Sequence, residues 1–506
     1  MGTLRNLCDN YLVRIRVVPT ASGKYAVQVV SKRYGIVTVH KHIGTFSDVS
    51  GKCQLYKKAK EFIAEATHQG NLLDLLSSCR PADVVITESR PLLVYQLLSA
   101  IYDKLGLNTY PDLLIKDLVI ARIYSPASKR ETREILADLF NRQWSLITIY
   151  RHLKKGIDTG LKDVFQKALI DFARDDLQDS LHLIFYDVTT LYFESTARDG
   201  IRDFGFSKDH RTQETQIVVG LVVNQQGFPL YFDVFRGRTF EGHTLCSVVK
   251  NIQKLLGSPD LVVVADAAML SQENIDQLIR EKISFIVGAR IGNLSSQMID
   301  QIASQLNGQD GKTITVTYRK QRLVCQYLRQ RAAKDRSDRE KQIARAQEII
   351  NAPKVKMRRY RFIKTAGETI TLNVDLVTKA ERLEGIKGYI TNIQLPDATV
   401  IERYHDLWRI EYAFRLTKSD LEARPVFHRL DETIQAHLVI VFAGLAICKY
   451  IENKSGMSIQ KVLKLAGKVL THKVTNIKTG ECAYIQTTIE DPNIKEKIDF
   501  LESLGH

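Results

Sequence analysis

The sequence lacks the features of a secreted or membrane-spanning protein. Its seven cysteines are widely spaced and include no CxxC pair, which argues against a disulfide framework and against a zinc site. The opening residues, MGTLRNLCDNYLVRIRVV, contain no apolar core of signal-peptide length. The most apolar run, Leu438 to Cys448, is about half the roughly 20 residues that span a bilayer. We therefore expect a buried core helix there and a cytoplasmic location.

The sequence also lacks internal repeats and low-complexity tracts. Its 506 residues are too many for one core, and roughly two to four domains are expected. The formal net charge is +15 and the pI is about 9.3. Such a balance predicts a polyanionic partner, most commonly nucleic acid; the alternative is a basic surface that serves only solubility.

The first third of the chain contains predicted strands followed by predicted helices. Residues 1 to about 50 alternate apolar and polar side chains, as β-strands do. A mixed helical stretch runs from about Tyr56 to Leu76, and a clearer helical region continues to about residue 175. Pro126 lies between two of its helices, and Trp144 lies just before a third. Short basic helices with tight connections suit either a DNA-binding module or an ordinary helical bundle.

From about residue 180 strands and helices alternate. LHLIFYD predicts a strand that ends at Asp187, and LVVVAD predicts a second that ends at Asp266. Between them lie a predicted hairpin, TQIVVGLVV-NQQG-FPLYFDVF, and an amphipathic helix with Gly257 as its stop. SQENIDQLIREK predicts a helix capped by Ser271, and SFIVGAR predicts a further strand.

A basic stretch, about residues 291 to 398, then interrupts this pattern. Residues 312–364 contain 17 Lys and Arg against 4 Asp and Glu, which is most of the excess charge of the chain. Its strand-like portions flank a charged helical one. A helix resumes at about Ile401, and another is predicted from a cap at Asp431.

Three acids stand out: Asp187, Asp266 and Glu411. The carboxyl ends of parallel neighbouring strands meet at one rim of an open sheet, where such sheets bind ligands, so the two aspartates are expected to lie together. Glu411 lies on a predicted helix that can pack against that sheet. The alternative is that each acid caps a turn or pairs with a basic neighbour. Thr189 and Thr190 are expected either to orient a bound water or phosphate or to be ordinary strand residues.

Three converging carboxylates repel one another unless cations neutralise them. Mg²⁺, for which Mn²⁺ can substitute, prefers oxygen ligands and accepts phosphate oxygens as well. Two such ions activate an attacking oxygen and stabilise a leaving one in displacement at phosphorus. We expect Asp187 to bridge both ions, with Asp266 and Glu411 each holding one side.

The chain resembles a DDE transposase of bacterial insertion sequences, of the IS4-like group and its IS1634-type branch. Four stretches carry the resemblance: FYDVTTLYFES, GFPLYFDVFRGRTFEGHT, VVVADAAMLSQENI and YHDLWRIEYAFRLTKSDLEARPVFHRL. It implies an α/β chain with an RNase H-like catalytic core, interrupted by a β-rich insertion and preceded by N-terminal β and helical DNA-binding domains. The expected domains are a β-rich domain (1–75), a helical DNA-binding domain (76–177), the first part of the core (178–290), the basic β-rich insertion (291–398), the second part of the core (399–455) and a C-terminal segment (456–506).

The IS4 group has a signature of Tyr, two residues, Arg, three residues, Glu, six residues and Lys. Tyr404, Glu411 and Lys418 occupy three of its positions, whereas Leu407 stands at the Arg position and Arg409 lies nearby. In relatives the Tyr, Arg and Lys contact DNA phosphates. A second departure follows Asp266, where many relatives have Arg-Gly and this chain has two alanines.

Helical spacing is expected to place the signature on one face. Tyr404, Trp408, Glu411, Arg415 and Lys418 step by four, three, four and three residues. Trp408 is expected either to receive an unstacked base or to pack in the core. The predicted DNA-binding residues are therefore Tyr404, Trp408, Arg409, Arg415 and Lys418.

The resemblance implies a transposase that binds terminal inverted repeats, nicks DNA at the element ends and joins the freed 3′-OH to target DNA. The expected partners are double-stranded DNA and a second copy of the chain, in the cytoplasm on the nucleoid. The residues alone imply only metal-dependent phosphoryl transfer on nucleic acid. The alternatives are an RNase H-like nuclease or resolvase without strand transfer, and a transposase-derived DNA-binding protein without catalysis.

Overall fold

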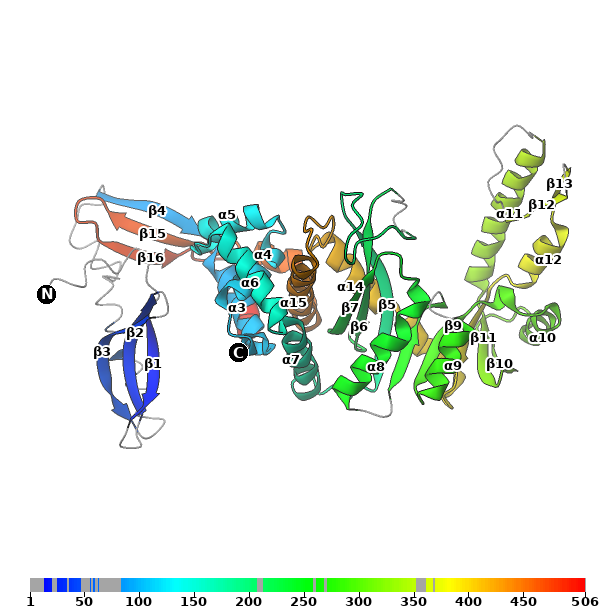
Figure 1. Cartoon of the computed structure of the whole chain (residues 1–506), viewed down its shortest axis with the longest axis horizontal. Coiled ribbons are helices and arrows are strands. Elements are labelled where there is room, and N and C mark those ends of the chain that lie inside the picture. The colour runs from blue at the N-terminus through cyan, green and yellow to red at the C-terminus, as the bar shows by residue number, and fades with distance from the viewer. Residues whose placement is uncertain are drawn as a thin grey trace. The chain divides into compact units, whose positions relative to one another are not determined.

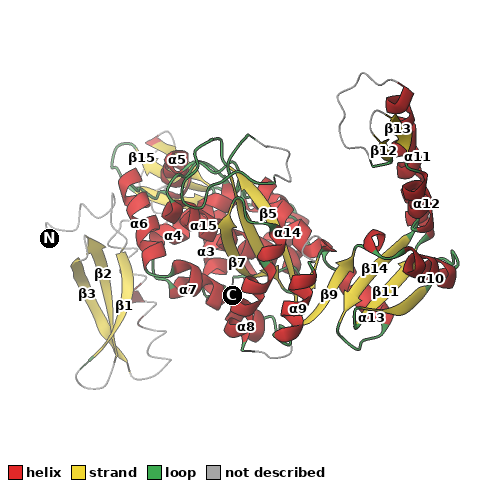
Figure 2. Cartoon of the chain, turned by 45° about the vertical axis from the view of Figure 1, so that its right-hand side comes forward, coloured by secondary structure: helices red, strands yellow, loops and turns green. Residues whose placement is uncertain are grey.

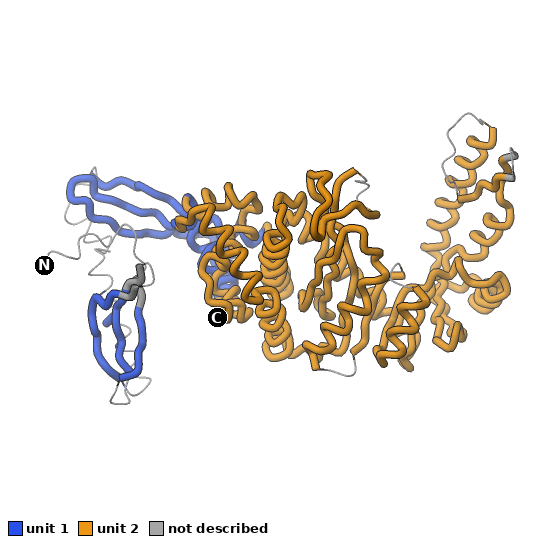
Figure 3. The backbone as a smooth tube through the Cα atoms, in the orientation of Figure 1, with its two compact units in different colours: residues 1–97, 138–141, 461–502 blue, residues 98–137, 142–460, 503–506 orange. Residues whose placement is uncertain are grey.

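The computed structural model forms two compact units, which Figure 3 colours separately. The first comprises residues 1–97, 138–141 and 461–502, and the second comprises 98–137, 142–460 and 503–506. The residues that the structure describes are 13–20, 25–33, 36–46, 55, 58–59, 62, 83–206, 213–257, 261–267, 271–351, 361–366 and 369–505.

The first unit contains an antiparallel three-stranded sheet, in the order β1-β2-β3 (Figure 1). Its strands are β1 (Val13–Pro19), β2 (Tyr25–Arg33) and β3 (Ile36–Phe46). Val27 and Val29 of β2 are buried, as the alternating pattern predicts. The strands expected in the first fifty residues are thus confirmed, whereas the helical stretch expected from Tyr56 to Leu76 lies almost entirely outside the described residues.

A second sheet of this unit joins distant parts of the chain. Its order is β16-β15-β4, and its strands are β4 (Val84–Arg90), β15 (Thr471–Asn476) and β16 (Cys482–Gln486). Thr87 Oγ1 donates to the Lys473 carbonyl at 3.2 Å, across 386 residues of sequence. None of these strands was predicted from the sequence. The helices α16 (Ile459–Ala466) and α17 (Pro492–Ser503) flank the two C-terminal strands in sequence.

The region that was predicted to be helical does consist of α-helices once strand β4 has ended. Its helices are α3 (Leu92–Lys104), α4 (Leu113–Tyr124), α5 (Lys129–Phe140), α6 (Leu146–Asp158) and α7 (Leu161–Asp175). Pro126 lies between α4 and α5, and Trp144 precedes α6, as predicted. The Trp144 indole donates to the buried Asp117 carboxylate at 2.8 Å, which ties the start of α6 to α4.

Helix α15 (Asp431–Ser455) is the central helix of the second unit and packs against α4, α6 and α7. By length and composition it is apolar enough to cross a membrane, but 94% of its most apolar window is buried inside the protein. The expected buried core helix is confirmed. Asp431 is its first residue rather than its cap, and its carboxylate accepts the Ile201 amide at 3.3 Å.

An eight-stranded mixed sheet forms the rest of the second unit, in the order β10-β11-β14-β9-β8-β5-β6-β7 (Figure 2). Strands β5, β8 and β9 are parallel, and the other pairings are antiparallel. The predicted hairpin, the two helices between strands and the strand after them are all present. The elements are β5 (Leu183–Tyr192), β6 (Gln216–Val223), β7 (Pro229–Arg236), α8 (Leu245–Leu256), β8 (Val262–Ala265), α9 (Gln272–Arg280) and β9 (Ser284–Ala289).

The local signals for these elements act as expected. Gly257 ends α8 with φ of 63°, a left-handed conformation that glycine adopts without strain. Ser271 caps α9 by accepting the Asn274 amide at 3.1 Å. Asn224 closes the hairpin, because its side-chain oxygen accepts the amides of Gln226 and Phe228 at 3.0 and 2.8 Å.

The insertion after β9 was expected to be β-rich, but it contains both helices and strands. Its strands β10, β11 and β14 extend the main sheet, and its longest element is the charged helix α11, which the sequence predicted. Helices α10 and α12 were not predicted. The elements are α10 (Ser296–Leu306), β10 (Thr313–Tyr318), β11 (Gln321–Tyr327), α11 (Arg329–Asn351), β12 (Ile363–Ala366), β13 (Thr369–Leu372), α12 (Val374–Arg382) and β14 (Ile386–Thr391).

Candidate active site

Two of the three predicted acids lie side by side on neighbouring parallel strands. In the register of β5 and β8, Tyr186 pairs with Ala265, and an aspartate follows each of them. Asp187 and Asp266 therefore come directly after the last paired residues of two adjacent parallel strands, which usually lie about 4.8 Å apart. Both side chains are half-buried. The predicted convergence of the two aspartates follows from this register.

Asp187 does not end its strand, contrary to the prediction. Strand β5 continues to Tyr192, because its residues beyond Asp187 stay paired with β6 although β8 has ended. Thr189 and Thr190 belong to this continuation and are buried, with 4% and 3% exposure. Their reading as ordinary strand residues is therefore confirmed.

Backbone amides and a tyrosine orient the two carboxylates. Asp187 Oδ1 accepts the Val188 amide at 2.8 Å, and Asp266 Oδ1 accepts the Ala267 amide at 2.6 Å. The Tyr404 hydroxyl donates to the same oxygen of Asp266 at 3.1 Å. Burial, then the Asp266 carboxylate, raises the pKa of Tyr404, so the hydroxyl keeps its proton and acts as a donor.

The signature does not lie on one continuous helix. Helix α13 (Asp397–His405) ends before α14 (Trp408–Ser419) begins, so Tyr404 is on the first helix and Glu411 on the second. At the junction the Leu407 amide donates to the Tyr404 carbonyl, three residues back rather than four. The predicted single helix is therefore wrong: Tyr404 lies on α13, and Trp408, Glu411, Arg415 and Lys418 lie on α14.

Glu411 is exposed on α14, which packs against β5 and β6. The Glu411 and Asp266 carboxylates act on the same two groups: both raise the pKa of Tyr404, and both counter the lowering of the Lys387 pKa. The two acids thus share an electrostatic neighbourhood. Among the residues that the structure describes, however, no group of three His, Cys, Asp or Glu side chains lies close enough to hold a metal ion.

The donor chemistry nevertheless fits divalent ions. Asp187 and Asp266 present half-buried carboxylates from adjacent strands, and carboxylate oxygens are the ligands that Mg²⁺ and Mn²⁺ prefer. Asp187 and Asp266 are the residues that would hold such an ion, and Glu411 is the acid on α14 that the prediction adds to them.

The signature residues have contrasting surroundings. Tyr404 is buried against Tyr389, with ring centroids 4.8 Å apart. Trp408 is 54% exposed, so the alternative prediction that it packs in the core is wrong. Leu407, at the signature Arg position, is buried, and a charged arginine there would have to leave the core.

The basic residues of α14 lie on different sides of the helix, since the nine-residue step from Arg409 to Lys418 makes about two and a half turns. Arg409 is half-exposed, forms an ion pair with Asp406 at 3.1 Å and lies 5.2 Å from the centroid of the Trp408 ring. Arg415 is exposed and lies over the Tyr412 ring at 4.8 Å. Lys418 is half-buried, so Trp408 and Arg415 are the exposed members of the predicted DNA-binding set on α14.

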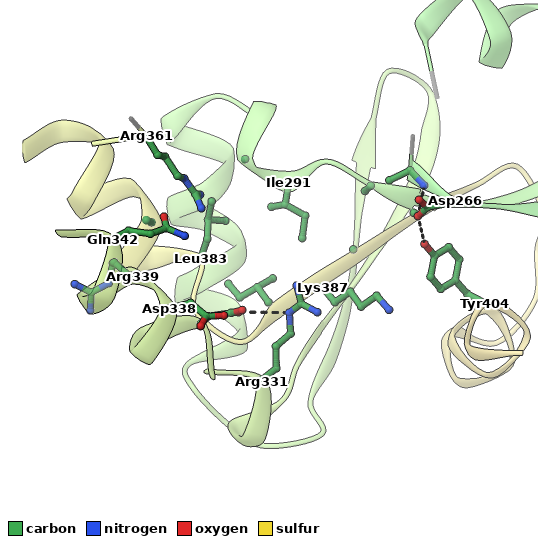
Figure 4. Close-up of a pocket in the computed structure, with 18 of the residues that line it drawn as sticks. Asp266, Ile291, Arg331, Asp338, Arg339, Gln342, Arg361, Leu383, Lys387 and Tyr404 are labelled. Carbon is green, nitrogen blue, oxygen red and sulfur yellow. Dashed lines mark hydrogen bonds and ion pairs between the residues drawn. The ribbon is translucent and has the colours of Figure 1, made fainter. Parts of the chain in front are cut away.

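A cavity of about 460 Å³ opens beside Asp266 (Figure 4). Tyr404 and Lys387 lie at its Asp266 side, and Arg331, Arg339 and Arg361 line the part formed by the insertion. Arg339 is paired with Glu381 and Glu384, at 2.8 and 2.7 Å. Asp335 and Asp338 also line the cavity, and Arg331 pairs with Asp335 at 3.4 Å, so the cavity joins a predicted catalytic carboxylate to a wall of paired charges.

Lys387 was not predicted as a site residue; it lies on β14 and extends toward Tyr404 (Figure 4). Its Nζ is 4.8 Å from the centroid of the Tyr404 ring. Burial, and then Arg331, lowers the pKa of Lys387, while Asp266 and Glu411 oppose that shift. The available signal was a lysine in the otherwise apolar strand IKGYIT.

Comparison with known proteins adds a family to this geometry. The family model described as "Transposase DDE domain" matches residues 180–447, more than half of the chain. No curated protein matches. Among solved structures, the chain is similar to one described as the cryo-EM structure of a piggyBac transposase synaptic complex with hairpin DNA. That similarity has 10% identity and a TM-score of 0.39, and it covers 75% of this chain and 79% of the other.

Proposed function

Because the chain belongs to the DDE transposase family, we propose that it binds the terminal inverted repeats of an insertion sequence, cleaves DNA at their ends and transfers the freed strand to target DNA. The observation that carries the proposal is the register of β5 and β8, which sets Asp187 beside Asp266 within the matched region. We assign it to the IS4-like group and the IS1634-type branch on its signature residues.

The strand order supports an RNase H-like core, the fold that the resemblance implies. The order β7-β6-β5-β8-β9 places the two aspartate strands at the centre, with β6 antiparallel to both of its neighbours. The insertion follows β9, and Glu411 comes after it. This arrangement matches the expected division of the core between Asp266 and Glu411.

Asp187 and Asp266 would hold two Mg²⁺ or Mn²⁺ ions, with Glu411 completing the ligand set. When bound, such ions activate the attacking oxygen and stabilise the leaving one. Tyr404 holds the Asp266 carboxylate in place through its hydroxyl. The side chains of Trp408, Arg409, Arg415 and Lys418 would contact the DNA along α14.

The charge distribution supports double-stranded DNA as the partner. Residues 312–364 of the insertion contain 17 Lys and Arg against 4 Asp and Glu, and strands of the insertion continue the sheet that leads to Asp266. Phosphate contacts by Lys and Arg make DNA affinity fall steeply with salt. We propose that the protein acts as a homodimer on the two element ends, as the resemblance implies.

Strand transfer is the test that separates the candidate functions. Purified protein is incubated with Mg²⁺, a labelled duplex carrying an end of the insertion sequence and a supercoiled plasmid target. The proposal expects labelled DNA joined to plasmid, and a duplex with a scrambled end serves as the control. Nicked duplex without joined product would indicate a nuclease or resolvase. Binding without cleavage in Mg²⁺ or Mn²⁺ would indicate a non-catalytic DNA-binding protein.

A further inference from the structure

A buried aspartate away from the carboxylate pair faces three arginines. Asp203 is 5% exposed. Its carboxylate lies 3.0 Å from Arg236 Nε, 3.5 Å from Arg198 Nε and 3.6 Å from Arg238 Nε. The arginine side chains are themselves 45%, 62% and 67% exposed, respectively. One carboxylate thus faces three guanidinium groups, which leaves a local excess of two positive charges.

The backbone beneath this arginine cluster, Arg198, Arg236 and Arg238, is tightly built. Asp203 exchanges two backbone hydrogen bonds with Gln216, at 3.2 and 2.9 Å, and its carboxylate accepts the Phe204 amide at 2.9 Å. Gly237 separates Arg236 from Arg238. A Cβ atom there would lie 2.0 Å from the Gln216 carbonyl oxygen and 2.4 Å from that of Asp203, so only glycine fits.

The third arginine is also held in place. Arg198 lies over the Phe204 ring, with its guanidinium carbon 4.6 Å from the ring centroid. An aromatic face attracts a cation and restricts its side chain. All three guanidinium groups are therefore oriented before any ligand arrives, which lowers the entropy lost when a ligand orders them.

The cluster lies on the same strand system as the candidate active site. Gln216 pairs with Tyr192, the last residue of β5, five positions beyond Asp187. At about 3.4 Å per residue this places the cluster roughly 17 Å along β5 from the aspartates. That distance corresponds to about five base pairs of a DNA duplex.

Gathering like charges is unfavourable unless an anion relieves the repulsion. A guanidinium group has five N–H donors, and a single carboxylate cannot engage all those of three arginines. Arginine forks match the tetrahedral oxygens of phosphate and form short charge-assisted hydrogen bonds with them. The exposed outer sides of these side chains thus offer a site for a phosphate dianion or a phosphodiester.

We propose that Arg198, Arg236 and Arg238 form a binding site for a backbone phosphate of the DNA substrate, outside the carboxylate site and about five base pairs from the cleaved bond. The proposal rests on the proposed function in one respect, that DNA is the substrate. Two of the three arginines lie in the stretch VFRGRTFEGHT, which would thus bind DNA apart from the catalytic carboxylates.

Salt dependence of DNA binding tests the site directly. The logarithm of the binding constant of a 30-base-pair duplex is measured against the logarithm of salt concentration for the full chain and for Arg236→Gln and Arg238→Gln. Because the three arginines share one phosphate, loss of that contact is expected to reduce the slope by up to about 0.9 in either variant. Arg236→Lys keeps the charge and should retain the slope while binding more weakly, since the fork is lost.

Lys250→Gln is the matched control for the loss of one charge. Lys250 is 40% exposed and pairs with Glu281 at 2.8 Å, so it resembles the cluster arginines in exposure and pairing. Its slope should equal that of the wild type. Slopes for both arginine variants that match the Lys250→Gln slope would overturn the proposal.

Two further outcomes separate this proposal from others. Absence of DNA binding by the wild type would contradict the proposed function itself. Inorganic phosphate that raises the melting temperature of the wild type but not of Arg236→Gln, with equal DNA slopes, would make the cluster a site for free phosphate and overturn the DNA assignment. Circular dichroism of each variant checks that the fold is intact.

Discussion

The Tyr404 hydroxyl donates a hydrogen bond to Oδ1 of Asp266 at 3.1 Å. The two residues are far apart in the sequence and come from α13 and the end of β8. Tyr404 also packs on Tyr389 of β14, so the insertion, the Glu411 region and the second aspartate meet at this one ring. The signature tyrosine thus has a structural task beside the carboxylate, in addition to any contact with DNA.

We predict that Tyr404→Phe raises the Mg²⁺ concentration needed for half-maximal DNA cleavage by about 10- to 100-fold, because Asp266 loses the donor that orients it. Cleavage is measured in a Mg²⁺ titration. Tyr412→Phe is the control, since the Tyr412 hydroxyl donates to Glu452 instead. A normal Mg²⁺ requirement in Tyr404→Phe would show that the hydrogen bond has no such role.

We expect Asp187→Asn, Asp266→Asn and Glu411→Gln each to reduce cleavage to background while end binding stays near the wild-type level. Each change keeps the side-chain size and removes the anionic oxygen that a divalent ion requires. Cleavage and gel-shift assays on the same duplex give both quantities. Asp406→Asn, which breaks an ion pair at the α13–α14 junction, is the control. Near wild-type cleavage by one of the three would remove that residue from the catalytic set.

Lys387→Met is expected to increase the stabilisation that Mg²⁺ gives the protein. The Lys387 ammonium group is a positive charge near Asp266 and Glu411, and without it their carboxylates depend more on metal ions for neutralisation. The measurement is the rise in melting temperature on adding Mg²⁺. Lys250→Met should leave that rise unchanged. An equal or smaller rise in Lys387→Met would contradict this charge-balancing role.

Trp408→Ala should weaken binding of DNA ends by about 1–3 kcal/mol, the usual contribution of a base stacked on an aromatic ring. Stability should change by less than about 0.5 kcal/mol, because the ring is exposed. Fluorescence anisotropy measures the binding, and urea denaturation measures the stability. A loss of stability with unchanged DNA affinity would instead show that Trp408 supports the fold.

Two histidines are expected to make the protein sensitive to acid. Burial, then Lys129 and Arg122, lowers the pKa of His428 to about 3. Burial, then Arg122 and Lys129, lowers the pKa of His437 well below its usual value. Both are neutral in the folded protein, whereas the unfolded chain takes up protons below about pH 6.5. Burial lowers the pKa of the neighbouring Arg122, and the Glu422 carboxylate opposes that shift.

Above about pH 6.5 the two histidines do not lower the free energy of unfolding. Below that pH the unfolded chain binds protons that the folded protein does not, so the free energy of unfolding falls as the pH drops toward 3. Between pH 6.5 and 5.0 each histidine should cost about 2 kcal/mol of unfolding free energy. Urea denaturation at pH 7.5 and 5.0 measures the change. His437→Gln should reduce the pH dependence, and His152→Gln, which removes a half-buried histidine that pairs with Asp112, is the comparison. A wild-type protein equally stable at both pH values would refute the prediction.

Local patterns were sufficient for much of the sheet. The hairpin β6–β7, the Gly257 stop and the Ser271 cap depend on neighbouring residues, and each was predicted and observed. The alignment of Asp187 with Asp266 followed from two apolar runs of sequence that each lead into an aspartate. By contrast, β15 pairs with β4 across almost the whole chain, and neither strand carries a local signal for its partner.

The site could be predicted only in part, because helical periodicity does not reveal a break. The spacing from Tyr404 to Lys418 continues without a fault through the junction at Asp406 and Leu407, yet the helix ends there. Nor does spacing tell that Trp408 faces solvent while Tyr404 is buried. Lys387 was missed because its neighbours, Asp266 and Glu411, come from other segments of the chain.

The hydrogen-bonded junction between β14 and β9 makes the insertion mechanically continuous with the sheet that carries Asp266. An element joined through a ladder of backbone bonds cannot swing as a hinged arm without breaking that ladder. If the insertion binds DNA as proposed, a pull on the bound duplex would therefore be transmitted through β9 and β8 to the end of the strand that leads to Asp266. Phosphate contacts on the insertion would then bear on the alignment of the carboxylates.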